Sequence, residues 1–256
     1  MIPSLINSLC SSPKGVISLI GAGGKTSLMF RLAKELAGSG KTVLTTTTTK
    51  IFFPDKGLSP ETIIAHSAED LIQKSTICLR QYSHFSAGRH HDPASGKLEG
   101  LSPDIVDSLW RAALFDWIIV EADGSRQKPL KATASHEPVV PESTTCLILV
   151  IGLDSVGLPL DEHHVHRAGI FSDNTGLAPG KPVDEQSISI SIAVEIKKAA
   201  GFCIAQDHIL FLNKADTQER IASGIKITNF LKGNKRISRI IVSSLKDDSC
   251  IKKEIS

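Results

Sequence analysis

The sequence has no excess of charge of either sign and no apolar run long enough to span a membrane. Its 256 residues include 29 lysines and arginines against 27 aspartates and glutamates, which gives a formal net charge of +2. A protein that coats nucleic acid would carry a strong basic excess, so this balance argues against that class. The longest apolar stretches, near residues 16–20 and 146–153, have the length of strands and are far shorter than a membrane span.

The sequence also lacks paired cysteines and the features of a leader peptide. Its five cysteines are Cys10, Cys78, Cys146, Cys203 and Cys250. An odd number at such wide spacing predicts neither a disulfide framework nor a zinc site. Residues 1–14 have neither the basic start nor the long apolar stretch of a signal peptide, so we expect a soluble cytoplasmic protein.

Short apolar runs alternate with amphipathic helical patterns along the chain. The apolar runs that predict strands cover residues 16–20, 42–47, 116–120, 146–151, 209–212 and 240–243. The helical patterns cover residues 28–36, 68–74, 103–113, 185–200 and 219–232. Apolar strands separated by helices indicate a mainly parallel sheet that is covered on both faces.

Two long polar stretches, residues 82–101 and 152–182, fit neither pattern. Loops of this length inside a compact domain are usually functional or mobile. We interpret them as long insertions in a single domain that covers residues 1–256. No internal repeat and no linker divides the chain.

A glycine-rich turn between the first strand and the first long helix carries the strongest chemical pattern. It consists of Gly21, Ala22, Gly23, Gly24, Lys25, Thr26 and Ser27. Glycines let backbone N–H groups turn toward phosphate oxygens, and the helix start adds partial positive charge. Lys25 would reach the β- and γ-phosphates, and the Thr26 hydroxyl would ligate Mg²⁺.

This turn is shorter than the usual GxxxxGK[ST] pattern because Leu19 stands where the first glycine is expected. The GxxGK[ST] form resembles the loops of Mur ligases and of some maturation GTPases. A glycine-rich turn without a ligand is the alternative, but the position between a buried strand and a helix favours a phosphate site. We therefore expect a three-layer α/β fold of the P-loop NTPase type.

The apolar run at 116–120 is followed by Glu121, Asp123 and Gly124. In an open α/β sheet the ligand lies beyond the carboxyl ends of the strands. Acids at that place can hold Mg²⁺, either directly or through water. We therefore predict that Glu121 and Asp123 join Thr26 at a magnesium site and contribute to catalysis; an ordinary strand end with exposed acids is the alternative.

Further candidates for the chemistry lie close to this strand end in the sequence. Together with Lys25, Arg126 is placed to offset charge on a transferring phosphoryl group. An arginine in a surface turn is, however, more often simply solvated. The hydroxyls of residues 47–49 could contact water at the metal or the attacking water, although threonine is also a common strand residue.

A third pattern, NKAD, follows the strand predicted at 209–212. It places Asn213, Lys214 and Asp216 in the order and position of the guanine-reading element of GTPases. The aspartate would accept the two guanine N–H groups that adenine lacks, so a buried carboxylate would stay unpaired with ATP. We therefore expect GTP in preference to ATP, with Asn213, Lys214 and Asp216 at the base.

Histidines are concentrated in the two polar stretches. His163, His164 and His166 lie beside two acids, and His90 and His91 form a second group. Imidazole and carboxylate ligands suit zinc, nickel or iron, but neighbours in sequence seldom all reach one ion. A loop that faces a partner or a substrate is therefore favoured over a metal site.

Several motifs occur in a fixed order and together resemble a known family. They are GAGGKTS, LTTTTTKIFFP, IIVEADGSRQKPLKA, HEPVVP, GLDSVGLPL followed by VHR, and LNKAD. In this combination, over about residues 14–217, the chain resembles the YqeC family of accessory proteins for selenium-dependent molybdenum hydroxylases. The resemblance implies a P-loop protein that acts in the maturation of those enzymes.

These observations together predict a Mg²⁺-dependent accessory factor that binds and hydrolyses GTP or ATP, with GTP favoured. Hydrolysis would switch a loop that contacts a client enzyme or a cofactor-carrier protein. We expect no nucleic-acid or membrane partner, and a homodimer is possible. The alternatives are an ATP-dependent ligase, a phosphoryl or nucleotidyl transferase acting on a selenium or molybdenum cofactor precursor, and a nucleotide-gated metallochaperone.

Overall fold

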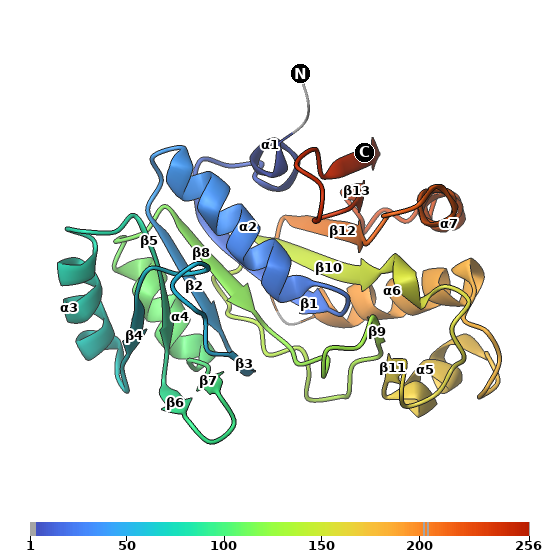
Figure 1. Ribbon diagram of the computed structural model, residues 1–256, viewed down its shortest axis with the longest axis horizontal. Coiled ribbons are helices and arrows are strands. Elements are labelled where there is room, and N and C mark those ends of the chain that lie inside the picture. Colours follow the sequence, from blue (N-terminus) through green and yellow to red (C-terminus); the bar gives the residue numbers. More distant parts are fainter. Residues whose placement is uncertain (1–3, 202, 204, 256) are drawn as a thin grey trace.

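The computed structural model describes residues 4–201, 203 and 205–255, and in this part of the chain a nine-stranded sheet forms the centre (Figure 1). Its strand order is β14-β13-β12-β10-β1-β8-β2-β5-β4. The strands are β1 (Gly15–Gly21), β2 (Val43–Thr47), β4 (Thr62–Ile64), β5 (His84–Gly88), β8 (Trp117–Glu121), β10 (Cys146–Gly152), β12 (Asp207–Asn213), β13 (Arg239–Ser243) and β14 (Ile251–Ile255). Every pairing in this sheet is parallel except β13 with β14, which confirms the mainly parallel α/β fold.

Helices cover both faces of the sheet, so the fold has three layers. They are α1 (Leu5–Leu9), α2 (Lys25–Gly38), α3 (Ala68–Cys78), α4 (Pro103–Arg111), α5 (Ala168–Thr175), α6 (Glu185–Ala199) and α7 (Gln218–Phe230). Because side chains alternate along a strand, Ile17 of β1 packs with α1 and α2 on one face and Val16 packs with the helices of the other. No helix in the described residues combines the length and the apolar character that a membrane crossing needs.

The interpretation of residues 82–101 as an insertion is corrected in part. Its first half is β5, a fully buried strand of the main sheet. This strand has no continuous apolar run because His84 and Ser86 are polar although they are buried. Both contact the hydroxyl of Thr45 on β2. The three-residue edge strand β4 was missed as well.

The second half of that stretch belongs to a small antiparallel sheet with the order β3-β7-β6. Its strands are β3 (Lys50–Phe52), β6 (His90–Asp92) and β7 (Lys97–Glu99). The threonine-rich end of β2 leads directly into β3, so the small sheet stands beside the carboxyl edge of the main sheet (Figure 1).

The second polar stretch, residues 152–182, folds around short elements. It contains the 3-10 turn η1 (Leu153–Ser155), the strand β11 (Val165–His166) and α5. β11 pairs in parallel with β9 (Leu130–Lys131), which follows the acids at the end of β8. This pairing brings the VHR motif next to the KPLKA motif, although more than thirty residues separate them.

Candidate functional site

The glycine-rich turn joins β1 to α2 in a backbone conformation that excludes other residues. Gly23 and Gly24 have φ angles of 88° and 125°. A Cβ on Gly23 would overlap the backbone of Gly152, and one on Gly24 would overlap the side-chain amide of Asn213. Gly24 precedes α2, and in the described chain no side chain caps this helix start. The N–H groups of the first turn therefore remain available to an anion.

Lys25 is folded back into the turn and is only 2% exposed. Its Nζ donates to the Gly21 carbonyl at 2.6 Å and lies 3.0 Å from Asp123 Oδ1 and 3.7 Å from Glu121 Oε1. Burial acts to lower the pKa of Lys25, but the two carboxylates outweigh it and hold the pKa above its ordinary value. Lys25 is therefore a buried, charged ammonium at the start of α2.

Thr26 and Glu121 face each other across the turn. The Thr26 hydroxyl donates to Glu121 Oε2 at 2.7 Å, and both residues line the cavity described below. Burial raises the pKa of Glu121, and nearby Lys25 opposes this. A hydroxyl and a carboxylate are hard oxygen donors, so this pair fits a Mg²⁺ ion.

Asp123 takes a different place from the one predicted for a metal ligand. It is fully buried, its Oδ2 accepts a hydrogen bond from the Gly21 N–H at 2.9 Å, and its Oδ1 lies beside Lys25. Asp123 is absent from the described residues that line the cavity. The Asp123 carboxylate thus holds the glycine-rich turn in place through Gly21 and Lys25, and Glu121 is the acid that faces the cavity.

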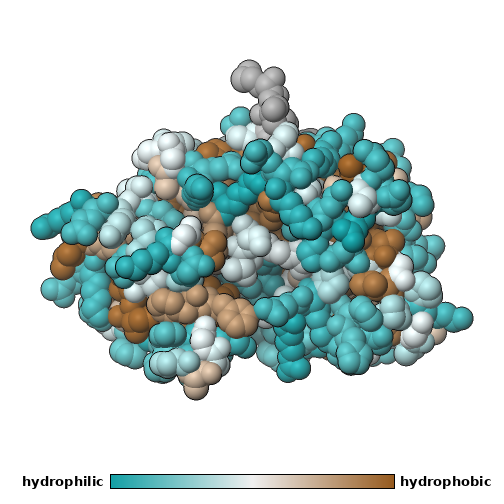
Figure 2. Space-filling model, in the orientation of Figure 1, coloured by the Kyte–Doolittle hydropathy of each residue, from teal (hydrophilic) through white to brown (hydrophobic). Residues whose placement is uncertain are grey.

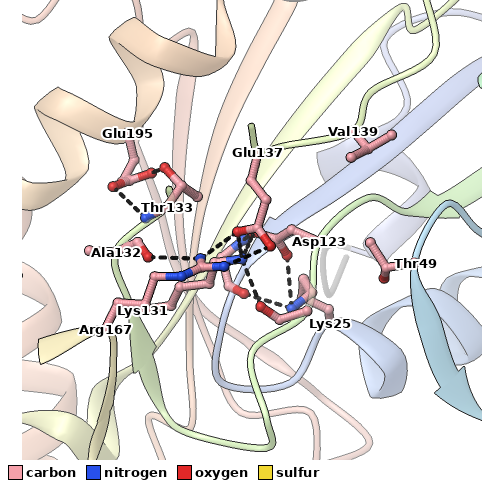
Figure 3. Close-up of polar contacts among 12 residues, drawn as sticks. Lys25, Thr49, Asp123, Lys131, Ala132, Thr133, Glu137, Val139, Arg167 and Glu195 are labelled. Carbon is pink, nitrogen blue, oxygen red and sulfur yellow. Dashed lines mark hydrogen bonds and ion pairs between the residues drawn. The ribbon is translucent and has the colours of Figure 1, made fainter. Parts of the chain in front are cut away.

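A chain of buried ion pairs runs from Asp123 away from the turn (Figure 3). Lys131 Nζ lies 3.0 Å from Asp123 Oδ2 and 2.6 Å from Glu137 Oε2, and it also donates to the Gly124 carbonyl at 2.7 Å. Arg167 binds Glu137 through two hydrogen bonds of 2.6 and 3.1 Å. Charges alternate in sign along this chain, so each buried group has an opposite partner.

Lys131 and Arg167 carry no local sequence pattern that predicts a site residue. They lie in the KPLKA and VHR motifs, which are brought together only by the pairing of β9 with β11. Burial acts to raise the pKa of Glu137, but hydrogen bonds from Arg167 and Lys131 prevail and hold the pKa near 2. Glu137 is therefore a carboxylate at any physiological pH.

The NKAD segment contacts the glycine-rich turn through Asn213. Its side-chain amide donates to the Gly23 carbonyl at 2.8 Å, and its Oδ1 accepts from the Leu245 N–H at 3.3 Å. Lys214, in the left-handed region at φ 64°, pairs with Asp154 at 2.7 Å and reaches the cavity. The amide of Asn213 thus links the glycine-rich turn to the loop that follows β12.

Asp216 lies farther along the same loop and does not line the cavity in the described residues. Its carboxylate accepts from Ser244 at 2.7 Å and pairs with Lys246 at 3.1 Å and Arg220 at 3.5 Å. Burial acts to raise the pKa of Asp216, and these partners outweigh it and lower the pKa. A guanine base would have to compete with Ser244 and Lys246 for this carboxylate.

A cavity of about 800 Å³ opens over the turn, and Figure 2 shows a hollow near the centre of this face. Its walls come from the turn, from the ends of β2 and β8, and from the small sheet. The residues on them include Gly24, Lys25, Thr26, Ser27, Thr48, Thr49, Lys50, Phe52, Arg89, Lys97, Glu99, Glu121, Gly124, Arg126, Lys128 and Lys214. Arg126, with a φ of 51°, makes no ion pair with any described residue.

The histidines of the second polar stretch do not come together. His163 is exposed, His164 contacts Asp161 at 2.8 Å, and His166 is buried with a pKa lowered to about 4, first by burial and then by Arg167. No group of three histidine, cysteine, aspartate or glutamate side chains is placed to hold a metal ion within the described ranges. The metallochaperone alternative thus finds no ligand set there.

Two solved structures are distantly similar to this chain. FtsY from Mycoplasma mycoides aligns with 91% of this chain and 62% of its own, at 14% identity and a TM-score of 0.42. Chloroplast FtsY from Physcomitrella patens aligns with 91% of this chain and 60% of its own, at 13% identity and a TM-score of 0.43. Similarity at this level does not bear on activity.

Comparisons of sequence are more specific. The "Uncharacterized protein YqeC" of Escherichia coli (strain K12) is 38% identical over 169 residues, which cover 64% of this chain and 62% of that protein. The chain thus aligns with less than two thirds of that relative's length. A family model described as YqeC protein matches residues 17–169, a range that includes the glycine-rich turn, both acids and the VHR motif. The chain belongs to the YqeC protein family.

Proposed function

We propose that this protein binds a nucleoside triphosphate together with Mg²⁺ at the glycine-rich turn and hydrolyses it. The observation that carries the proposal is Lys25, a charged, buried lysine beside an uncapped helix start. Backbone N–H groups and an ammonium at one helix start form an anion site, which is what a polyphosphate requires. The oxygen pair of Thr26 and Glu121 supports a metal at the same place.

Each group in this site has a distinct role in the proposal. Lys25 would exchange its contacts with Gly21 and Asp123 for phosphate oxygens, and Asp123 would keep its partner Lys131. Thr26 and Glu121 would hold Mg²⁺, which offsets the negative charge of the phosphates when it is bound. Arg126, which lines the cavity after the end of β8, would reach the transferring phosphoryl group.

We infer GTP as the preferred nucleotide from the NKAD segment. Asn213 contacts the turn through Gly23, so the loop that follows β12 stands next to the phosphate site. Asp216 would read the base after giving up its contacts with Ser244 and Lys246. As the resemblance to accessory proteins suggests, the hydrolysis would serve the maturation of selenium-dependent molybdenum hydroxylases through a client enzyme or a cofactor carrier.

Binding of fluorescent GTP and ATP analogues, titrated with and without Mg²⁺, tests the proposal. Lys25→Ala should abolish binding, and Asp216→Ala should remove the preference for guanine. Lys34→Ala is the matched control, because Lys34 is an exposed lysine on the same helix. Binding that survives Lys25→Ala would refute the phosphate site, and equal affinity for the two nucleotides in the wild type would refute the base assignment alone.

A ligase or transferase reaction is the second candidate, and the extent of the cavity favours it. The cavity continues from the turn to the small sheet, where Phe52 and Lys97 line it. A pure hydrolase needs no room for a second substrate on that wall. An ATP-dependent ligase, or a phosphoryl or nucleotidyl transferase acting on a selenium or molybdenum cofactor precursor, would show little hydrolysis until that substrate is added.

A further inference from the structure

We propose that the wall formed by β3, β7 and Arg89, which directly precedes β6, is a binding site for an organic anion that carries a flat, conjugated ring. The site is the part of the cavity that faces the glycine-rich turn from the other side, and we call it the platform. It consists of Lys50, Phe52, Arg89, Lys97 and Glu99. The proposal rests on the second candidate function, the ligase or transferase reaction, and deepens it by naming the class of the second substrate.

The platform is fixed rigidly against the main sheet. A Cβ on Gly100 would overlap the backbone of Thr47, and one on Gly88 would overlap the side chain of Leu98. Leu98 and Ile51 point into the core and are almost completely buried. Close packing of this kind leaves the small sheet little freedom to shift, so the outer residues hold a defined position.

The alternation of side chains along β3 and β7 turns the remaining residues toward the cavity. Ile51 and Leu98 face the core, so their neighbours Phe52 and Lys97 face outward. Phe52 is 56% exposed although it lines a cavity, and the Lys97 ammonium lies 5.8 Å from the centre of its ring. An exposed aromatic ring with an ammonium over one face suits a flat, conjugated ligand that also carries negative charge.

Positive charge exceeds negative charge on the platform and on the segment after β8 that holds Arg126. Glu99 is paired with Lys50 at 2.6 Å. In the part of the chain that the structure describes, Arg89, Lys97 and Arg126 have no carboxylate partner. Three cations that line one cavity without counter-ions attract an anion, and the guanidinium groups of Arg89 and Arg126 suit phosphate or carboxylate oxygens.

A nucleotide bound at the turn leaves this wall uncovered. The base-reading loop follows β12, which lies two strands from β1 on one side, whereas β2 and the platform lie beyond β8 on the other. Of the described NKAD residues only Lys214 lines the cavity, and Asp216 lies outside it. The phosphates would therefore lie between the base and the platform, with the terminal phosphate nearest to the second ligand.

Flavin mononucleotide, whose fluorescence reports binding, is a suitable probe because it combines a flat ring with a phosphate. Riboflavin lacks the phosphate and ribose 5-phosphate lacks the ring. These two compounds therefore separate the contribution of the ring to the binding affinity from that of the phosphate. We expect flavin mononucleotide to bind with a dissociation constant below about 1 mM in the presence of a non-hydrolysable GTP analogue. Each comparator should bind about tenfold more weakly or not at all, because each lacks one of the two contacts.

Two substitutions on the platform test the assignment of residues. Phe52→Ala and Arg89→Gln should each weaken the flavin mononucleotide about fivefold or more while leaving the affinity for the GTP analogue unchanged. Phe230→Ala and Arg80→Gln are matched controls, since Phe230 is 57% exposed on α7 and Arg80 is exposed after α3, both outside the cavity lining. The controls should bind both ligands as the wild type does.

The outcomes separate this proposal from the proposed function. If the GTP analogue binds and no ring-bearing probe does, the platform proposal is overturned and the phosphate site stands. The same conclusion follows if flavin mononucleotide displaces the analogue and its binding depends on Lys25 instead of Phe52. If flavin mononucleotide binds in a way that depends on Phe52 while the GTP analogue does not bind, the platform stands and the proposed function fails. If neither Phe52→Ala nor Arg89→Gln changes the affinity for flavin mononucleotide, the platform proposal is also overturned.

Discussion

Lys25 and Asp123 form a buried ion pair, with Nζ 3.0 Å from Oδ1, so the residue proposed to bind phosphate is held by the acid beneath the turn. Both side chains are almost completely excluded from solvent. The pair keeps Lys25 charged, and Lys131 would remain as the partner of Asp123 Oδ2 if Lys25 turned to a phosphate as proposed. Because Lys25 is already desolvated and charged, binding to phosphate would not add the cost of burying its ammonium.

The first prediction concerns this lysine. Lys25→Met should weaken nucleotide binding by about two orders of magnitude, because the phosphates lose a charge-assisted contact. It should also lower thermal stability, since Asp123 would lose one of its two cationic partners. Isothermal titration and thermal unfolding of the same sample measure both effects. Normal nucleotide affinity in a folded Lys25→Met protein would contradict the prediction.

The second prediction separates the metal from the phosphates. Thr26→Ala should lower the affinity for nucleotide about tenfold when Mg²⁺ is present and should have little effect in excess chelator, because the hydroxyl is proposed to hold the metal. Thr76→Ala removes an exposed hydroxyl on α3 and serves as the control. An equal loss with and without Mg²⁺ would assign Thr26 to the phosphates instead.

The third prediction concerns the buried network. Lys131→Met should destabilise the protein by about 3–5 kcal/mol, because Asp123 and Glu137 would share a buried region without the cation between them. Urea unfolding measures the loss. Lys253→Met, on the exposed part of β14, should change stability by less than about 0.5 kcal/mol. A loss of the same small size for Lys131→Met would show that the network contributes no net stability.

The fourth prediction is a pH dependence that arises from His84. Burial lowers its pKa from 6.5 to about 4, so the folded state favours neutral imidazole more than the unfolded state does. The stability is therefore fully present above pH 6.5 and is lost as the pH falls toward 4, by about 2 kcal/mol at about pH 5 from this residue alone.

Urea titrations over this pH range test the prediction with His84→Gln, which should lose stability less steeply between pH 6.5 and 4. His166, whose pKa is also about 4, stays in both proteins and leaves part of the slope. His66→Gln, at an exposed site, should follow the wild-type curve. Parallel curves for the wild type and His84→Gln would show that His84 does not titrate as stated.

Local pattern was sufficient to predict six of the nine strands that form the main sheet in the described residues, namely β1, β2, β8, β10, β12 and β13, whereas β4, β5 and β14 were not predicted. The runs at 16–20, 116–120 and 146–151 became β1, β8 and β10, because a fully buried parallel strand is apolar on both faces. β5 does not follow this pattern, because its buried residues include His84 and Ser86. Their polar groups are satisfied by hydrogen bonds with Thr45 on β2. A strand whose burial depends on a partner residue has no apolar signature of its own.

The sequence by itself determined the glycine-rich turn and its place between β1 and α2, because φ angles such as that of Gly24 and a helix start are local properties. Only the tertiary structure decided which acid faces the cavity. Glu121 and Asp123 are two residues apart on one strand end, and the difference arises from Lys131, which approaches Asp123 from β9. The platform is likewise a tertiary feature, since Phe52 and Arg89 line the same cavity as the turn only because the small sheet packs on the main sheet. Contacts between distant segments depend on how the layers pack, and that information is spread over the whole chain.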